Sequence, residues 1–193
     1  MKSRHLAAAL LVLVLLLLPA VSKAQSGNEK HLATIREHYS GAMEMLKMKS
    51  DPEYPAKDKI VITSDEMWPG SGQHNGKMEI FFGLDLNQEN DEILRFPRFA
   101  RYTYNIGSQD YYYEVLYLDE DNGKPETNKP IFFYAKTKDY DGKIHECRYY
   151  WWNEKLIQYI PGDDTEMVPS AEDALKAARM IFQIATMNDL WNY

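Results

Sequence analysis

Two glutamates are the residues whose types and surroundings could serve catalysis. Glu114 and Glu146 each lie within an otherwise apolar stretch that is expected to form a β-strand. A carboxyl group on a crowded sheet face can have a raised pKa and act as a general acid. One hypothesis is therefore a hydrolase that uses two carboxylates, for example on glycans. The structural alternative, which we favour, is that Arg101 or Arg148 pairs with these glutamates.

His145 and Cys147 form a second pair with chemical potential. They are two residues apart on one expected strand, so both side chains point to the same face. The spacing of about 6.5–7 Å along the strand is loose for a thiolate–imidazole pair. Cys147 is the only cysteine, so the chain contains no internal disulfide. We interpret Cys147 as a buried core residue beside a half-exposed histidine.

No metal or cofactor motif is recognised, and neither group is expected. His31 and His38 are two helical turns apart, about 10 Å along the axis, which one metal ion cannot bridge. The segments 119–123 and 139–142 contain the Asp and Gly of a calcium loop but lack its distal glutamate. The glycine-rich stretch 68–76 does not have the spacing of a phosphate-binding loop, so we interpret it as a long hairpin connection.

Aromatic residues supply the most distinctive surface. Of the 25 aromatic residues, 16 lie between Phe99 and Ile160, in strands whose two faces are both partly aromatic. Tyrosine and tryptophan combine a large apolar body with a polar group, which suits interfaces. If both helices pack on one face of the sheet, the other face could meet a partner; the alternative is that this face is merely amphipathic. The predicted binding residues are Tyr112, Arg148, Tyr150 and Trp152.

The order of elements predicts an α+β fold. Apolar residues recur at helical spacing from Ser26 to Met48 and again after Pro169 and Ser170. Between these helices, β-branched and aromatic runs alternate with turn residues, which predicts a curved antiparallel meander of six or seven strands. The first strand is expected over Lys59–Thr63, where the run Ile60–Ile62 is too continuous to face water on both sides. The C-terminal helix is expected to pack on one face of the sheet.

Residues 1–24 have the features of a cleaved signal peptide. A basic start precedes an apolar run from Leu6 to Leu18, which is shorter than the roughly 20 residues of a membrane-spanning helix. Ser22 and Ala24 place small residues where a signal peptidase reads them. We therefore expect residues 25–193 to be periplasmic or secreted as a single domain, with no membrane insertion after cleavage.

The charge balance limits the classes of partner. Removal of the leader takes away three basic residues and no acidic one, so the net charge changes from −7 to −10. Such a surface repels nucleic acid and anionic lipid, and neither is an expected partner. The expected partners are a protein, a peptide or a glycan.

A resemblance agrees with this interpretation. The string Ile35–Tyr39 followed by Met43-Glu44-Met45, and the run Arg148–Trp151 leading to Lys155-Leu156-Ile157, resemble small secreted proteins from gut bacteria of the Bacteroidales type. The resemblance covers nearly the whole chain after the leader and rests on residues that bear the fold. That group has no assigned activity, so the resemblance implies no functional residues.

The favoured hypothesis is an exported, non-catalytic binding or interaction module that uses an aromatic sheet face. A carboxylate-dependent hydrolase built on Glu114 and Glu146, or a structural component of the cell envelope, are the alternatives.

Overall fold

The computed structural model describes residues 27–47, 58–70, 72–87, 92–118, 128–162 and 167–189. The expected leader, Ser26 and the 119–123 turn lie outside these ranges. The chain divides into two compact units, residues 1–37 and 38–193, and the second contains the whole sheet and the C-terminal helix. The single domain expected from residue 25 stays a prediction.

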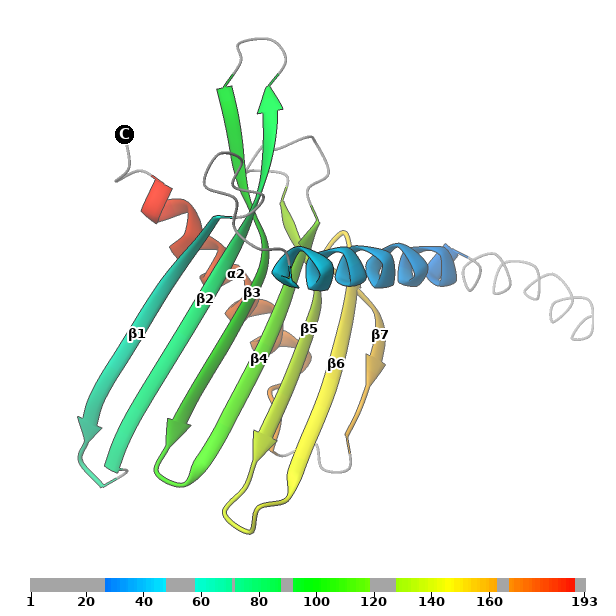
Figure 1. The fold of residues 1–193 in the computed structure, drawn as a ribbon. Helices are drawn as coiled ribbons and strands as arrows, with labels where there is room; N and C mark the ends of the chain where they lie inside the picture. Colours follow the sequence, from blue (N-terminus) through cyan, green and yellow to red (C-terminus); the bar gives the residue numbers. More distant parts are fainter. Residues whose placement is uncertain are drawn as a thin grey trace, which may run out of the picture. The chain divides into compact units, whose positions relative to one another are not determined.

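Seven strands form one antiparallel sheet in which every strand pairs with its neighbours in the sequence (Figure 1). The strands are β1 (Asp58–Trp68), β2 (Gly72–Asn87), β3 (Glu92–Ile106), β4 (Gln109–Leu118), β5 (Lys129–Lys138), β6 (Ile144–Trp152) and β7 (Lys155–Ile160). An N-terminal helix spans residues 27–47, and α2 spans Ala171–Asp189. The α+β fold predicted from the sequence is confirmed.

The structure differs from expectation at the first hairpin. The connection expected over residues 68–76 is instead a tight turn, because β1 continues to Trp68 and β2 begins at Gly72. Gly70 and Gly72 have positive φ angles of 84° and 83°, which glycine adopts without steric cost. The strands that face each other here are therefore longer than the apolar pattern indicates.

One face of the sheet, the α2 face, packs against the C-terminal helix. It carries Ala100, Val115, Phe133 and Tyr149, and the helix buries Ala174, Ala178, Ile181 and Ala185 in the same cluster. The Tyr117 hydroxyl donates to the Ala178 carbonyl over 2.8 Å, which the small alanine side chains permit by allowing close approach. At the start of the helix, the Asp173 amide donates to Ser170 Oγ over 3.2 Å, so Ser170 caps the helix that the sequence predicts after Pro169.

The opposite face, the Tyr39 face, contacts the N-terminal helix through Tyr39. The Tyr39 ring packs edge-on against Phe99 and Phe132, with centroids 6.3 and 5.3 Å apart. Tyr39 and α2 therefore contact opposite faces, so the condition that both helices pack on one face is not met. The physical reason is that β3 to β6 carry apolar residues on both sides, since Phe99, Leu116, Phe132 and Tyr150 alternate with the residues of the α2 face. The apolar side chains on each face must therefore be shielded from water by a separate packed element.

The first strand is more exposed than expected. β1 lies at one edge of the sheet, and the side chains of Val61 and Ile62 are 45% and 37% exposed. The expectation that this run would not face water on both sides is wrong for Val61 and Ile62, because within the described residues only β2 pairs with this strand.

Candidate binding groove on the Tyr39 face

Glu114 is held by phenol groups and not by arginine. It is buried, and its two carboxylate oxygens accept hydrogen bonds from Tyr39 at 2.7 Å and Tyr112 at 2.5 Å. Burial, together with these bonds to Glu114, raises the pKa of both phenols. Arg101, a partner expected from the sequence, instead bonds Glu79 at 2.6 Å.

Glu146 is paired as the structural alternative predicts. Arg148 Nη2 lies 3.3 Å from its carboxylate, and the Tyr134 hydroxyl also bonds this group. The Arg148 guanidinium lies 5.0 Å from the centre of the Tyr134 ring. Arg148 thus belongs to a small cluster with two neighbours on the same face.

The two glutamates are not arranged as a catalytic pair. They lie on β4 and β6, with Tyr134 and Lys136 of β5 between them in the strand register. Two strand spacings separate their backbones by about 10 Å, and Glu146 is also displaced along the strand. Paired carboxylates in glycosidases are about 5–9.5 Å apart and face a common bond. Glu114 is also closed off by its two phenols.

The four predicted binding residues have different environments. Tyr112 is half-buried beside an open groove, and Arg148 is partly exposed. Trp152 is partly exposed near the end of β6. Tyr150 is only 8% exposed and packs against Phe132 with ring centroids 5.1 Å apart, so it has little surface for a ligand.

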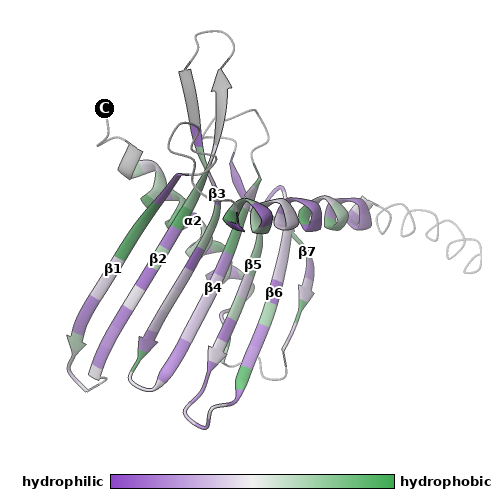
Figure 2. Cartoon of the chain, in the orientation of Figure 1, coloured by the Kyte–Doolittle hydropathy of each residue, from purple (hydrophilic) through white to green (hydrophobic). Residues whose placement is uncertain are grey.

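The groove beside Tyr112 has a volume of about 750 Å³, within the range of about 300–1,000 Å³ typical of ligand sites. It lies toward the β3–β4 and β5–β6 hairpins, at the bottom of Figure 1. Hydrophilic residues predominate along this part of β2 to β5 (Figure 2). We call it the lysine groove, after the residues that shape it: Lys77, Thr103, Tyr112, Tyr134, Lys136 and Lys138.

The strand register explains why these side chains meet. Lys77 is opposite Thr103, Thr103 is opposite Tyr112, and Tyr112 is opposite Lys136. Residues directly opposite each other share a face, with Cβ atoms about 5 Å apart. One row of the sheet thus runs through four strands to form the floor of the groove. Sequence analysis missed the lysines, although the alternation of Tyr134, Lys136 and Lys138 places them on one face.

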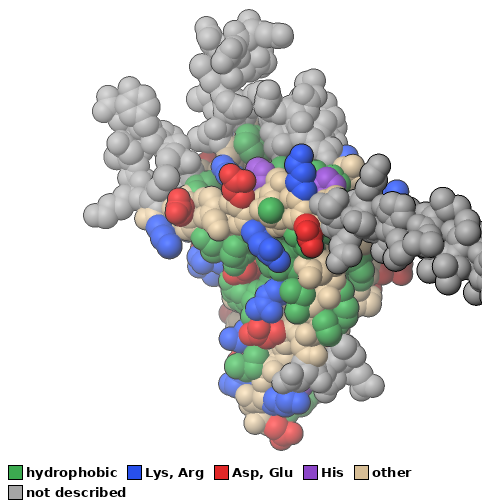
Figure 3. All heavy atoms as spheres, turned by 90° about the vertical axis from the view of Figure 1, so that its right-hand side faces the viewer, with side chains coloured by type: hydrophobic (Ala, Val, Ile, Leu, Met, Phe, Trp, Pro, Cys, Tyr) green, Lys and Arg blue, Asp and Glu red, His purple; other side chains and the backbone are tan. Residues whose placement is uncertain are grey.

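Cations exceed acids in the groove and at its border. The Glu79 carboxylate is within 4.0 Å of three cationic groups, on Lys59, Lys77 and Arg101. Burial opposes ionisation of Glu79, but the hydrogen bonds from these cations outweigh it and lower its pKa to about 2. Lys138 lies 3.6 Å from Asp110. On the side of the molecule seen in Figure 3, by contrast, basic and acidic side chains are interspersed.

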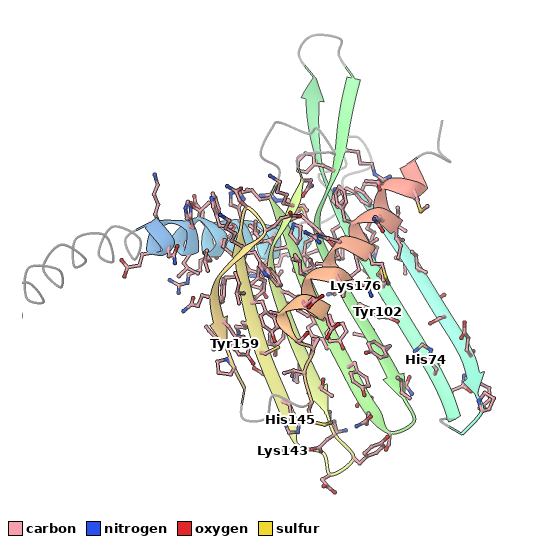
Figure 4. The ribbon with its side chains drawn as sticks, turned by 180° about the vertical axis from the view of Figure 1, so that it is seen from behind. His74, Tyr102, Lys143, His145, Tyr159 and Lys176 are labelled. Atoms are coloured by element: carbon pink, nitrogen blue, oxygen red, sulfur yellow. The ribbon has the colours of Figure 1, made fainter. Side chains whose placement is uncertain are left out.

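The α2 face carries a tyrosine cluster beyond the helix. Tyr104 stacks on Tyr111 at 4.5 Å and on Tyr102 at 4.9 Å, and its hydroxyl is 3.0 Å from that of Tyr113. Figure 4 shows α2 crossing this face, with Tyr102 and His74 on the sheet beside it. The tyrosine rings stack on one another, and the Tyr104 and Tyr113 hydroxyls are hydrogen-bonded, so we do not assign a ligand to this cluster.

His145 and Cys147 are both buried on the α2 face. The predicted burial of Cys147 is confirmed, and burial raises the pKa of its thiol. The expectation of a half-exposed histidine is wrong: His145 is 1% exposed, and its Nε2 lies 2.9 Å from Asp139 Oδ2. The hydrogen bond with His145 lowers the pKa of Asp139. Asp139 Oδ1 also accepts the amides of Asp141 and Lys143, which explains the 139–142 turn without a metal ion.

No group of three or more metal-ligating side chains comes together within the described part of the chain. The helices described here also include none with the length and apolar character that a membrane crossing requires. No protein family model, curated protein or solved structure matches the chain.

Proposed function

We propose that this protein is a non-catalytic binding module and that the lysine groove holds its ligand. The observation that carries the proposal is the groove itself, which gathers polar side chains from four strands around a space of about 750 Å³. A rigid sheet supports these side chains, so little ordering would be needed on binding. The expected export of the chain supports a ligand outside the cytoplasm.

Two aromatic rings border the groove, those of Tyr112 and Tyr134, and Tyr112 is one of the binding residues predicted from the sequence. Their rings meet edge-to-face, with centroids 6.1 Å apart. Because both hydroxyls bond to glutamates, the rings are held in place. They can offer apolar surface to a ligand beside the polar groups of the groove.

The hydrolase hypothesis has less support. Glu114 is buried and bonded to Tyr39 and Tyr112, and Glu146 is paired with Arg148. Each carboxylate is thus engaged by neighbouring side chains, and the two do not face a common space.

The test is to fill the groove without changing its charge. Thr103 is exposed and lines the groove floor between Lys77 and Tyr112, so Thr103→Trp places a large side chain in the ligand space. Thr63→Trp is the matched control, because Thr63 is exposed on the same face but does not line the groove. Each variant is screened against arrays of oligosaccharides and peptides, after a thermal melt confirms that it is folded.

We expect the parent and Thr63→Trp to bind the same array members, and Thr103→Trp to bind them at least about tenfold more weakly, a loss of about 1.4 kcal/mol. Ligands that bind Thr103→Trp as tightly as the parent would show that the groove is not the binding site.

A further inference from the structure

We infer that the ligand of the lysine groove is an anionic oligosaccharide, one that carries carboxylate or sulfate groups. This inference rests on the proposed function, since it names the class of ligand that the same groove would take. It follows from three properties of the groove: an excess of cations, a floor of paired backbone groups, and two fixed aromatic rings.

The first property is the position of the cations. Lys136 lies in the register between Tyr112 and Glu146, and among the described residues no carboxylate oxygen lies within 4.0 Å of its ammonium group. At the β2 side of the groove, Glu79 is shared by three cations, and one carboxylate cannot neutralise all of them. Lys138 has Asp110 as its partner. An anion entering here meets more cationic than anionic side chains in the lining, although the whole chain is acidic.

The second property excludes one mode of recognition. The groove lies over β2 to β6, which are inner strands paired on both sides. An extended peptide that adds to a sheet needs the free backbone groups of an edge strand. The lysine groove offers only side chains, so its ligand must be recognised by charge, by hydroxyl or amide contacts and by ring packing.

The third property favours a sugar over an acidic peptide. The Tyr112 and Tyr134 hydroxyls are bonded to Glu114 and Glu146, which leaves ring carbon surface for contact. Pyranose rings present C–H groups that pack on such surfaces, while their hydroxyls can bond to Thr103 and to Asn75, another lining residue.

The experiment measures the affinity of the exported chain for chains of matched length: an oligogalacturonide, a heparin-derived oligosaccharide, a neutral cello-oligosaccharide and an oligoglutamate. The two anionic sugars distinguish carboxylate from sulfate. Lys136→Gln removes the central charge and keeps a polar side chain that is one atom shorter. Lys143→Gln is the control, because Lys143 lies outside the groove in the β5–β6 turn (Figure 4).

We expect at least one anionic sugar to bind the parent and Lys143→Gln equally, and Lys136→Gln about five- to tenfold more weakly, as loss of one partly screened charge pair implies. The affinity of the parent should also fall as ionic strength rises.

Three results would overturn the inference: no binding by either anionic sugar, equal binding of the oligoglutamate, or equal binding of the neutral sugar. If only the neutral sugar binds and Thr103→Trp still abolishes that binding, the anionic class is wrong while the proposed function stands. If Thr103→Trp binds every ligand normally, the proposed function fails as well.

Discussion

Glu79 shows how single residues keep an ionised carboxylate within this sheet. Its side chain is 5% exposed, yet it is surrounded by Lys59, Lys77 and Arg101 at 3.1, 3.3 and 2.6 Å. A buried carboxylate that lost such partners would carry a desolvation penalty without compensation. One of these cations, Lys77, lines the lysine groove, so Glu79 links the stability of the sheet to the charge of the candidate site.

The lowered pKa of Glu79 predicts a specific dependence of stability on pH. Its pKa falls from 4.5 to about 2 on folding, so its contribution is complete above about pH 4.5 and is lost as the pH falls through about 2. The shift corresponds to at most about 3 kcal/mol at neutral pH, and less where solvent screens the half-exposed lysines. We expect Glu79→Gln to be less stable than the parent at pH 7, with a difference that shrinks toward pH 2.5.

Urea unfolding of the parent and Glu79→Gln at several pH values measures this difference. Glu44→Gln, an exposed position on the N-terminal helix, is the matched control and should follow the parent at every pH. A difference between Glu79→Gln and the parent that stays constant from pH 7 to pH 3 would contradict the assigned ionisation.

At the scale of elements, the chief finding is that the two faces of the sheet have separate covers. The α2 face packs against Ala174, Ala178 and Ile181, while Tyr39 packs against Phe99 and Phe132 on the other face. The arrangement leaves the hairpin ends of β2 to β5 to form the groove.

The contact made by Tyr39 can be tested by removing one atom. Tyr39→Phe keeps the ring that packs on Phe99 and Phe132 but removes the 2.7 Å hydrogen bond to Glu114. A hydrogen bond to a charged group contributes about 1.5–3 kcal/mol, and we expect a loss of stability in this range by denaturant unfolding. Tyr140→Phe, at a position that is 70% exposed, should cause no measurable change. Equal stability of Tyr39→Phe and the parent would argue that the helix end does not lie on this face.

Local patterns predicted much of this arrangement, and long-range pairing determined the rest. The alternation in residues 111–118 and 144–152 correctly separated the two faces, and the Ser170–Asp173 cap was readable because it is local. The face on which each helix packs could not be predicted from local patterns, because both sides of the central strands are apolar. The groove could not be predicted from the sequence either, since only the register of four strands places Lys77 and Lys136 in one row.

For the whole molecule, the central feature is a local excess of cations on an acidic chain. The net charge of −7 disfavours non-specific attraction of polyanions, so an anionic ligand would be selected by the geometry of the lysine groove and not by the general field of the protein. Glu114 and Glu146, which first suggested catalysis, instead hold the two tyrosines that border this groove. Carboxylates, aromatic rings and lysines thus form one surface suited to recognition.

The most direct test of this account is an NMR titration of the lysine side chains. Reductive methylation with ¹³C keeps the charge of each lysine and gives each side chain its own signal. On addition of whichever anionic sugar binds the parent, the oligogalacturonide or the heparin-derived oligosaccharide, we predict shifts for the methyl groups of Lys77, Lys136 and Lys138 and unchanged signals for Lys143, Lys155 and Lys176. Shifts confined to the second set, or spread evenly over both sets, would contradict the assignment of the lysine groove as the binding site.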